Sequence, residues 1–225
     1  MDIDRSPNLA QRAGVHRALG DPHRLRIVDA LRRSDRTPSE LAGLTGLGSN
    51  LLAFHLDVLA EAEVITRHRS EGDGRRRYVR LDPRVSAVIG PDPGAPDLTG
   101  ERVLFVCTAN SARSQFAAAL WSRVTGQPAE SAGSTPADAV HPLAVQVGTR
   151  YGLELAERHP RSYREVTSPP QVVVSVCDRA REGGPPPAPL QLHWSVADPV
   201  GGDEAAFQAA FDELHTRVQS LARAA

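Results

Sequence analysis

The stretch from Val103 to Ser114, Val-Leu-Phe-Val-Cys-Thr-Ala-Asn-Ser-Ala-Arg-Ser, decides the fold of the second half of this chain. An apolar run of strand length leads directly into Cys107, and Arg113 and Ser114 open an Ala-rich stretch typical of a helix. A loop between a buried strand and a helix N-terminus points several backbone N–H groups at one spot, where the helix dipole adds positive potential. The stretch therefore predicts an oxyanion cradle that contains a thiol.

The residue types in this loop suit anion chemistry. The planar guanidinium of Arg113 can grip two oxygens of a phosphate-like group, and the positive field favours the nucleophilic thiolate form of Cys107. The alternative is a buried structural cysteine that precedes an arginine by chance, which the order strand, loop, helix disfavours. The predicted oxyanion-binding residues are Thr108, Ala109, Asn110, Ser111, Ala112, Arg113 and Ser114.

Residues 101–225 resemble the low-molecular-weight protein tyrosine phosphatase fold, and most closely its arsenate reductase branch. Besides the Cys-x5-Arg-Ser loop, Ser131–Ser134 is similar to a second-strand segment of that superfamily, and His193–Pro199 is similar to its late loop with an Asp-Pro pair. The resemblance implies an α/β fold with a parallel sheet and makes Asp198 the general acid, although an Asp-Pro taken alone is more often a turn.

The second cysteine, Cys177, ends another apolar run at Val172–Val176, which places it at the sheet edge where Cys107 is expected. The resemblance implies a role in resolving Cys107, but a third cysteine of the self-resolving reductases is replaced here by Gly184. Either Cys177 attacks Cys107 and an external redoxin reduces the pair, or a small thiol attacks Cys107 directly. The candidate donors are thioredoxin, glutathione with glutaredoxin, and mycothiol with mycoredoxin, while an inert buried Cys177 is the alternative. We expect no tightly bound cofactor.

Three functions remain open from the sequence. The first is an arsenate reductase, a thiol-dependent oxidoreductase, joined to a regulator. The second is a phosphatase, which Val200-Gly201-Gly202 disfavours because these residues offer no aromatic ring for a substrate to stack on. The third is an oxyanion- or redox-sensing repressor without meaningful turnover.

The first part of the chain predicts a separate α+β domain. Asp21-Pro22 supplies an N-cap and a first-turn Pro, Thr37–Glu40 is a capping box, and Ser49 is expected to cap a longer helix. Val64–Arg69 and Arg75–Leu81 alternate as strands around a Gly-Asp-Gly turn, which indicates a hairpin. The order helix, turn, helix, hairpin predicts a winged helix-turn-helix.

Residues 10–85 resemble the ArsR-type transcriptional repressors through Ala18–Ile27, Glu40–Ala42 and His55–Leu59. The resemblance implies a homodimer that places the helix at 49–62 in the major groove of double-stranded DNA. This part of the chain has no cysteine, so it cannot capture arsenite by thiolates, and its histidines lack a metal-ligand spacing. The expected DNA-binding residues are Ser49, Asn50, Phe54, His55, Arg75, Arg76 and Arg77.

Charge and composition complete the predicted organisation. Residues 1–90 carry 15 Arg and 12 acidic residues, a net charge of +3 that suits a phosphate backbone, whereas the remainder is net −4. We predict domains at residues 1–85 and 101–225, joined by a Pro- and Gly-rich linker at 86–100. Because the sequence has no signal peptide and no apolar run of membrane length, we expect a cytoplasmic location.

Overall fold

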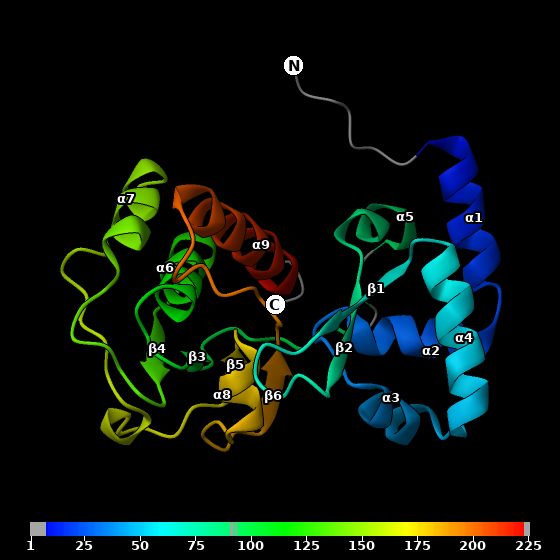
Figure 1. Cartoon of the computed structure of the whole chain (residues 1–225), viewed down its shortest axis with the longest axis horizontal. Helices are drawn as coiled ribbons and strands as arrows, with labels where there is room; N and C mark the ends of the chain where they lie inside the picture. The colour runs from blue at the N-terminus through cyan, green and yellow to red at the C-terminus, as the bar shows by residue number, and fades with distance from the viewer. Residues whose placement is uncertain (1–7, 91, 93, 223–225) are drawn as a thin grey trace. The chain divides into compact units, whose positions relative to one another are not determined.

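A computed structural model describes residues 8–90, 92 and 94–222 of the chain (Figure 1). The chain divides into two compact units. One contains the residues up to Arg69 together with Arg75–Gly94, and the other contains Ser70–Gly74 together with the residues from Ala95 onward. Among the described residues, no helix is both long and apolar enough to cross a membrane.

The first unit is a helical domain with a two-stranded hairpin. Its core is formed by side chains such as Ile27, Leu41, Leu59 and Val79, all of which are fully buried. Its elements are α1 (Leu9–Leu19), α2 (Pro22–Leu31), α3 (Pro38–Thr45), α4 (Ser49–Glu61), β1 (Ile65–Arg69), β2 (Arg77–Leu81), η1 (Pro83–Val85) and α5 (Ser86–Ile89).

Local sequence explains most of these boundaries. The Asp21 carboxylate caps α2 by accepting hydrogen bonds from His23 and Arg24, and Thr37 and Glu40 form the predicted capping box of α3. β1 and β2 pair antiparallel from Ile65–Leu81 to Arg69–Arg77, which confirms the predicted hairpin. One cap differs from the prediction, because Gly48 is the N-cap of α4 and Ser49 is its first helical residue.

The first unit also extends further than the pattern predicted. Val85 is buried in its core, and Val88 and Ile89 pack against that core from α5. The predicted linker at 86–100 therefore begins with a helical turn, because these apolar side chains can bury their surface against the helical domain.

The second unit is built on a four-stranded sheet with the order β4-β3-β5-β6. All three strand pairs are parallel, which confirms the predicted α/β fold. Its elements are β3 (Val103–Cys107), α6 (Arg113–Thr125), β4 (Ala129–Gly133), α7 (Pro142–Arg150), η2 (Tyr163–Glu165), β5 (Val172–Ser175), α8 (Asp178–Glu182), β6 (Leu190–His193) and α9 (Glu204–Ala222).

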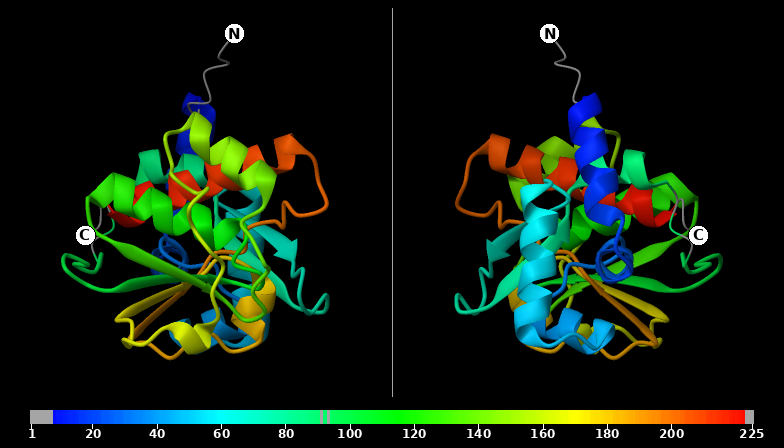
Figure 2. Two further views of the ribbon diagram at one scale, coloured as in Figure 1. Left: turned by 90° about the vertical axis from the view of Figure 1, so that its left-hand side faces the viewer. Right: turned by 90° about the vertical axis from the view of Figure 1, so that its right-hand side faces the viewer.

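The two faces of the sheet are covered by different segments. Helices α6, α7 and α9 cover one face, where Phe105, Trp121 and Trp194 form part of the larger core (Figures 1 and 2). The segment that carries Tyr163 and Val166 packs on the other face. Strands with both faces covered are expected to be almost wholly apolar, and β3 is buried along its whole length. The sheet thus holds the end of β3 rigidly.

Candidate active site

The loop after β3 is shaped by the backbone of a neighbouring segment. The N–H groups of Ser134, Thr135 and Ala137 donate to the carbonyl oxygens of residues 107, 108 and 109, and that of His141 donates to the carbonyl of Ser111. Because these carbonyl groups are already paired, the N–H groups of the loop are available for a ligand, and that of Asn110 points to Cys107 Sγ. Such a loop beside the first turn of a helix suits an anion.

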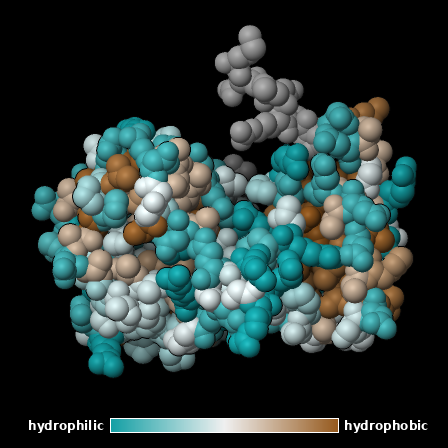
Figure 3. All heavy atoms as spheres, viewed as in Figure 1, coloured by the Kyte–Doolittle hydropathy of each residue, from teal (hydrophilic) through white to brown (hydrophobic). Residues whose placement is uncertain are grey.

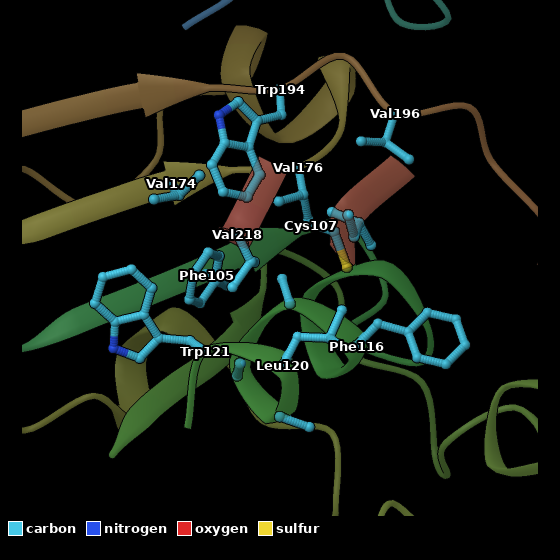
Figure 4. Close-up of a cluster of buried hydrophobic side chains, with 14 of the residues drawn as sticks. Phe105, Cys107, Phe116, Leu120, Trp121, Val174, Val176, Trp194, Val196 and Val218 are labelled. Carbon is cyan, nitrogen blue, oxygen red and sulfur yellow. The ribbon is translucent and has the colours of Figure 1, made fainter. Parts of the chain in front are cut away.

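Cys107 lies at the base of this cradle. Its thiol is buried at the edge of the apolar core formed by Phe105, Phe116 and Val176 (Figure 4). The backbone N–H of Asn110 lies 3.2 Å from Sγ, and the hydroxyl of Ser114 lies 3.0 Å from it. Both groups can donate to a negatively charged sulfur.

The direction of the Ser114 hydroxyl follows from its second contact. The side-chain amide of Asn110 donates to Ser114 Oγ at 2.8 Å, and its own Oδ1 accepts the backbone N–H of Arg161 at 2.9 Å. A backbone N–H only donates, so this contact fixes which end of the Asn110 amide is oxygen. Ser114 therefore accepts from Asn110 and has its proton free for the sulfur of Cys107.

Asn110 holds the loop in an unusual backbone conformation. Its φ of 50° is one of two positive values among the described non-glycine residues, and Asn tolerates this region better than most side chains do. Gln115 donates to both its carbonyl and its Oδ1, which adds to the contacts with Ser114 and Arg161. These hydrogen bonds hold the strained conformation in place.

Arg113, the first residue of α6, points toward the late loop. Its guanidinium donates to the carbonyl of Val196 at 2.9 Å and pairs with the Asp198 carboxylate at 2.8 Å. Arg113 is 5% exposed, whereas the side chain of Asp198 is 36% exposed. The structure thus brings together the predicted anion-binding arginine and the predicted acid.

Cys177 lies at the same edge of the sheet as Cys107. Its Sγ is 3.5 Å from Thr108 Oγ1 and accepts the N–H of Ala180 at 3.3 Å, so it caps α8. Burial raises the pKa of the Cys177 thiol; the charge of Arg113 opposes this and that of Cys107 adds to it, and the net shift is upward. Cys177 is therefore predominantly a neutral thiol near pH 7.

A buried contact between a carboxylate and an imidazole holds the residue that follows Cys177. Asp178 Oδ1 lies 3.1 Å from His193 Nε2, and His193 Nδ1 lies 3.0 Å from Ser175 Oγ. Burial would raise the pKa of Asp178, but hydrogen bonds from His193 and Ser195 outweigh burial and lower it. Asp178 and His193 join the end of β5 to β6.

Three residues that support the loop were not predicted from the sequence. A Cβ atom at Gly133 would collide with the carbonyl oxygen of Thr108, so only glycine fits there. Tyr163 donates its hydroxyl to the carbonyl of Cys107 at 3.2 Å, and Arg161 braces Asn110. Neither Tyr163 nor Arg161 lies in a local pattern that reveals its partner.

The remaining predicted oxyanion-binding residues lie in the loop between β3 and α6. Thr108 and Ala109 are partly buried, whereas Ser111 and Ala112 are buried. Beyond Asp198 and Pro199, the exposed Val200 and two glycines form a turn. Among the described residues, no group of three or more His, Cys, Asp or Glu side chains is arranged to hold a metal ion.

Comparison with known families agrees with this geometry. A model described as low molecular weight phosphotyrosine protein phosphatase matches residues 102–225, more than half of the chain. This chain belongs to that phosphatase family. A second model, described as a helix-turn-helix domain, matches residues 19–68. The comparisons therefore confirm the predicted phosphatase family of the second unit and the predicted helix-turn-helix of the first.

Several relatives of the phosphatase-family unit are arsenate reductases. Arsenate reductase 1 of Bacillus cereus is 30% identical over 125 residues, covering 53% of this chain and 92% of the relative. Arsenate reductase 2 of Staphylococcus epidermidis is 28% identical over 123 residues, covering 53% of this chain and 94% of the relative. A solved structure of an arsenate reductase in its oxidized state is 23% identical with a TM-score of 0.50, covering 55% of this chain and 97% of that one, and it supports the fold.

The helix-turn-helix unit displays most of the residues expected to face DNA. Ser49, Asn50 and Phe54 on α4 are exposed, as are Arg75, Arg76 and Arg77 at the hairpin. His55 contradicts the prediction, because its side chain is 4% exposed and lies 3.9 Å from the Asp21 carboxylate. The helical period turns His55 to the core side together with Leu52 and Leu56, so it cannot contact bases.

Proposed function

We propose that this chain reduces arsenate to arsenite through Cys107 and carries an ArsR-type DNA-binding regulator domain. One observation carries the proposal. The anion cradle contains a hydrogen-bonded thiol, and a second buried thiol, Cys177, contacts the side chain of the loop residue Thr108 at 3.5 Å. Two adjacent thiols can supply the two electrons that the reduction of arsenic(V) to arsenic(III) requires.

The first step is nucleophilic attack on bound arsenate. The loop amides and Arg113 hold the anion, and its arrival displaces Asp198 from Arg113. The Cys107 thiolate forms a sulfur–arsenic bond, the bond from arsenic to one of its hydroxyl groups breaks, and this leaving hydroxyl takes a proton from Asp198 and departs as water. Arsenic is still in the +5 state after this step.

The second step transfers the electrons. A second thiolate attacks the Cys107 sulfur, a disulfide forms, and the electron pair of the broken sulfur–arsenic bond remains on arsenic as arsenite. We propose that Cys177 supplies this thiolate and that an external redoxin reduces the resulting disulfide. Cys107 follows Val106 on β3, and Cys177 comes two residues after Ser175, the register partner of Val106 on the adjacent strand β5.

The rim of the site favours a small inorganic oxyanion over a phosphorylated aromatic side chain. The turn beyond Asp198 is Pro199, Val200, Gly201 and Gly202, which offers no ring to stack on a phenyl group. Arsenate needs no such ring, because it presents only oxygen atoms, which hydrogen-bond donors of the loop and the guanidinium of Arg113 can bind.

The test is steady-state turnover of arsenate and, separately, of p-nitrophenyl phosphate by the purified chain. Thioredoxin, glutathione with glutaredoxin, and mycothiol with mycoredoxin are supplied in turn. Arsenite release that depends on one donor is the expected result and names the partner. If the chain releases phosphate but releases no arsenite with any of the donors, it is a phosphatase rather than an arsenate reductase. If it turns over neither substrate, it is a sensor.

Two cysteine variants separate the steps. Cys107→Ser removes both activities, because it removes the nucleophile. Cys177→Ser removes redoxin-coupled arsenate turnover but leaves p-nitrophenyl phosphate hydrolysis, which needs the anion-binding loop, Cys107, Arg113 and Asp198 but not Cys177. That hydrolysis is the internal control for folding, and arsenate turnover retained with a small thiol would assign the second step to that thiol instead.

The helix-turn-helix unit supports a proposal of double-stranded DNA as a partner. Its exposed arginines at positions 75–77 suit phosphate contacts, and α4 presents Ser49 and Asn50 at its N-terminus. We propose a homodimer formed through this unit, acting in the cytoplasm where DNA and reducing thiols are both available. Sedimentation of the chain with and without a selected duplex measures the stoichiometry, and a monomer on DNA would contradict the dimer.

A further inference from the structure

The second helix of the helix-turn-helix, α4, has an unusual outer face. Its inner face packs Leu52, Leu56 and Leu59 into the core, as an amphipathic helix should. On the outer face, Leu51 is 47% exposed and Phe54 is 57% exposed. Apolar residues therefore stand where a DNA-reading helix ordinarily carries hydrogen-bonding groups.

The polar groups of this face are few and lie near its start. Ser49 and Asn50 begin the helix, and the exposed residues that follow them, Leu51, Ala53 and Phe54, are apolar. Asp57, one turn beyond Ala53, pairs with Arg67 of β1 at 2.8 Å, so its charge is compensated within the unit. Figure 3 shows brown, apolar residues at the surface of this unit among teal, polar ones, in the region where Figure 1 draws α2 and α4.

The setting of this face fits a nucleic acid better than an apolar protein surface. Arg69 and the arginines at 75–77 are exposed at the hairpin of the same unit. The first turn of α4 has no side-chain cap, which leaves its N–H groups facing outward with the positive end of the helix dipole. Phosphates on both sides of a groove complement these exposed positive charges.

We propose that Leu51 and Phe54 read the 5-methyl groups of thymines in the major groove. This inference rests on the proposed DNA binding of the same unit and names the base chemistry that it recognises. Thymine is the base that presents a methyl group in this groove, and apolar side chains distinguish it by contact with that methyl. Ser49 and Asn50 then supply the hydrogen bonds at one end of the half-site, and the hairpin arginines contact the backbone.

The expected loss of DNA affinity is small for each methyl group and accumulates when several methyl groups are removed. Burial of one methyl group is worth roughly 0.8 kcal/mol, which corresponds to about a four-fold change in affinity. Loss of two or three contacted methyl groups in a dimer site should therefore weaken binding by about one to two orders of magnitude. Deoxyuridine differs from thymidine in this group alone, so it measures the contact without changing base pairing.

The experiment begins with selection of a preferred duplex from a random pool by the full chain. Affinity is then measured for this duplex and for copies in which thymines are replaced, one position at a time, by deoxyuridine. We expect weaker binding for deoxyuridine at a few adjacent positions in each half-site. We also expect Phe54→Ala and Leu51→Ala to bring the thymine-to-uracil ratio at those positions close to one.

Controls separate the possible failures. Val124→Ala, an exposed apolar residue of α6, is the matched variant and should leave the ratio unchanged. If the chain selects a duplex but binds thymine and uracil equally, the methyl inference is wrong and DNA binding stands. If the chain selects no duplex, both the methyl inference and the proposed DNA binding are wrong. If Phe54→Ala changes self-association without DNA and leaves the ratio unchanged, this face is a contact between copies of the chain.

Discussion

Single residues decide the chemistry at the sulfur of Cys107. The Ser114 hydroxyl and the Asn110 N–H both donate to it, and the orientation of Ser114 depends on an amide that Arg161 fixes from a distant segment. This chain of hydrogen bonds delivers two preorganised donors to the sulfur.

The raised pKa of Cys177 predicts a pH-dependent second step. Disulfide formation requires the Cys177 thiolate, whose fraction rises about ten-fold per pH unit below its pKa. In a single-turnover experiment with arsenate and no external donor, the rate of disulfide formation should therefore rise steadily from pH 7 to 9. Mass spectrometry of alkylated samples measures the rate, and a flat profile would show that Cys177 is not the attacking group.

Elements determine whether the cradle can form. The loop after β3 packs directly on the end of β4, and the segment at 134–141 pairs with its carbonyl groups. The sheet edge and this segment thus determine the conformation of the loop. Substitutions outside the Cys-x5-Arg-Ser motif should therefore also affect anion binding.

Gly133→Ala tests the contact between β4 and the loop. The added Cβ meets the Thr108 carbonyl, so we expect a loss of roughly 1–3 kcal/mol in stability and weaker phosphate binding. Gly43→Ala on α3 is the matched control, because a Cβ there meets no atom within 4 Å and alanine favours a helix by about 1 kcal/mol. Thermal unfolding measures the stability of the two variants, and titration measures their affinity for phosphate. Normal phosphate binding by Gly133→Ala would refute the packing argument.

The lowered pKa of Asp178, which is hydrogen-bonded to His193, predicts acid sensitivity of the sheet edge. The folded state lowers the pKa of Asp178, so the pair stabilises the fold above the ordinary aspartate pKa, and this contribution is lost as the pH falls through the lowered value. Asp178→Asn should therefore cost roughly 1–2 kcal/mol at pH 7 and less near pH 3. Denaturant unfolding at both pH values measures the difference, and an equal cost at both would exclude the charge as the cause.

At the scale of the whole molecule, the two units have separate hydrophobic cores. Val15 to Val85 supply the core of the first unit, and the cores of the second unit draw on residues from Leu98 onward. A ligand of the anion cradle should therefore stabilise the second unit through its own core.

Phosphate, as a stable analogue of arsenate, tests this expectation. A concentration of 100 times the dissociation constant stabilises a binding unit by about 2.7 kcal/mol. Hydrogen exchange should slow in peptides of β3, α6 and β4 and stay unchanged in those of α2 and α4. Arg113→Ala should abolish the effect, and slowing in both units would show instead that the anion couples them.

Much of this protein follows from its sequence alone. A buried strand that runs into Cys107, the spacing to Arg113, and the caps at Asp21 and Thr37 specify both folds, because strand burial and helix capping depend on neighbours a few residues away. The places of Cys107 at the end of β3 and of Arg113 at the start of α6, and the hairpin, were predictable for the same reason.

Tertiary structure decided what depends on distant partners. The inward rotation of His55, the packing of α5 on the first unit, the orientation of Ser114 through Asn110 and Arg161, and the need for glycine at 133 all arise from contacts between segments far apart in the chain. No local pattern encodes such contacts, because they exist only once the sheet has brought these segments together.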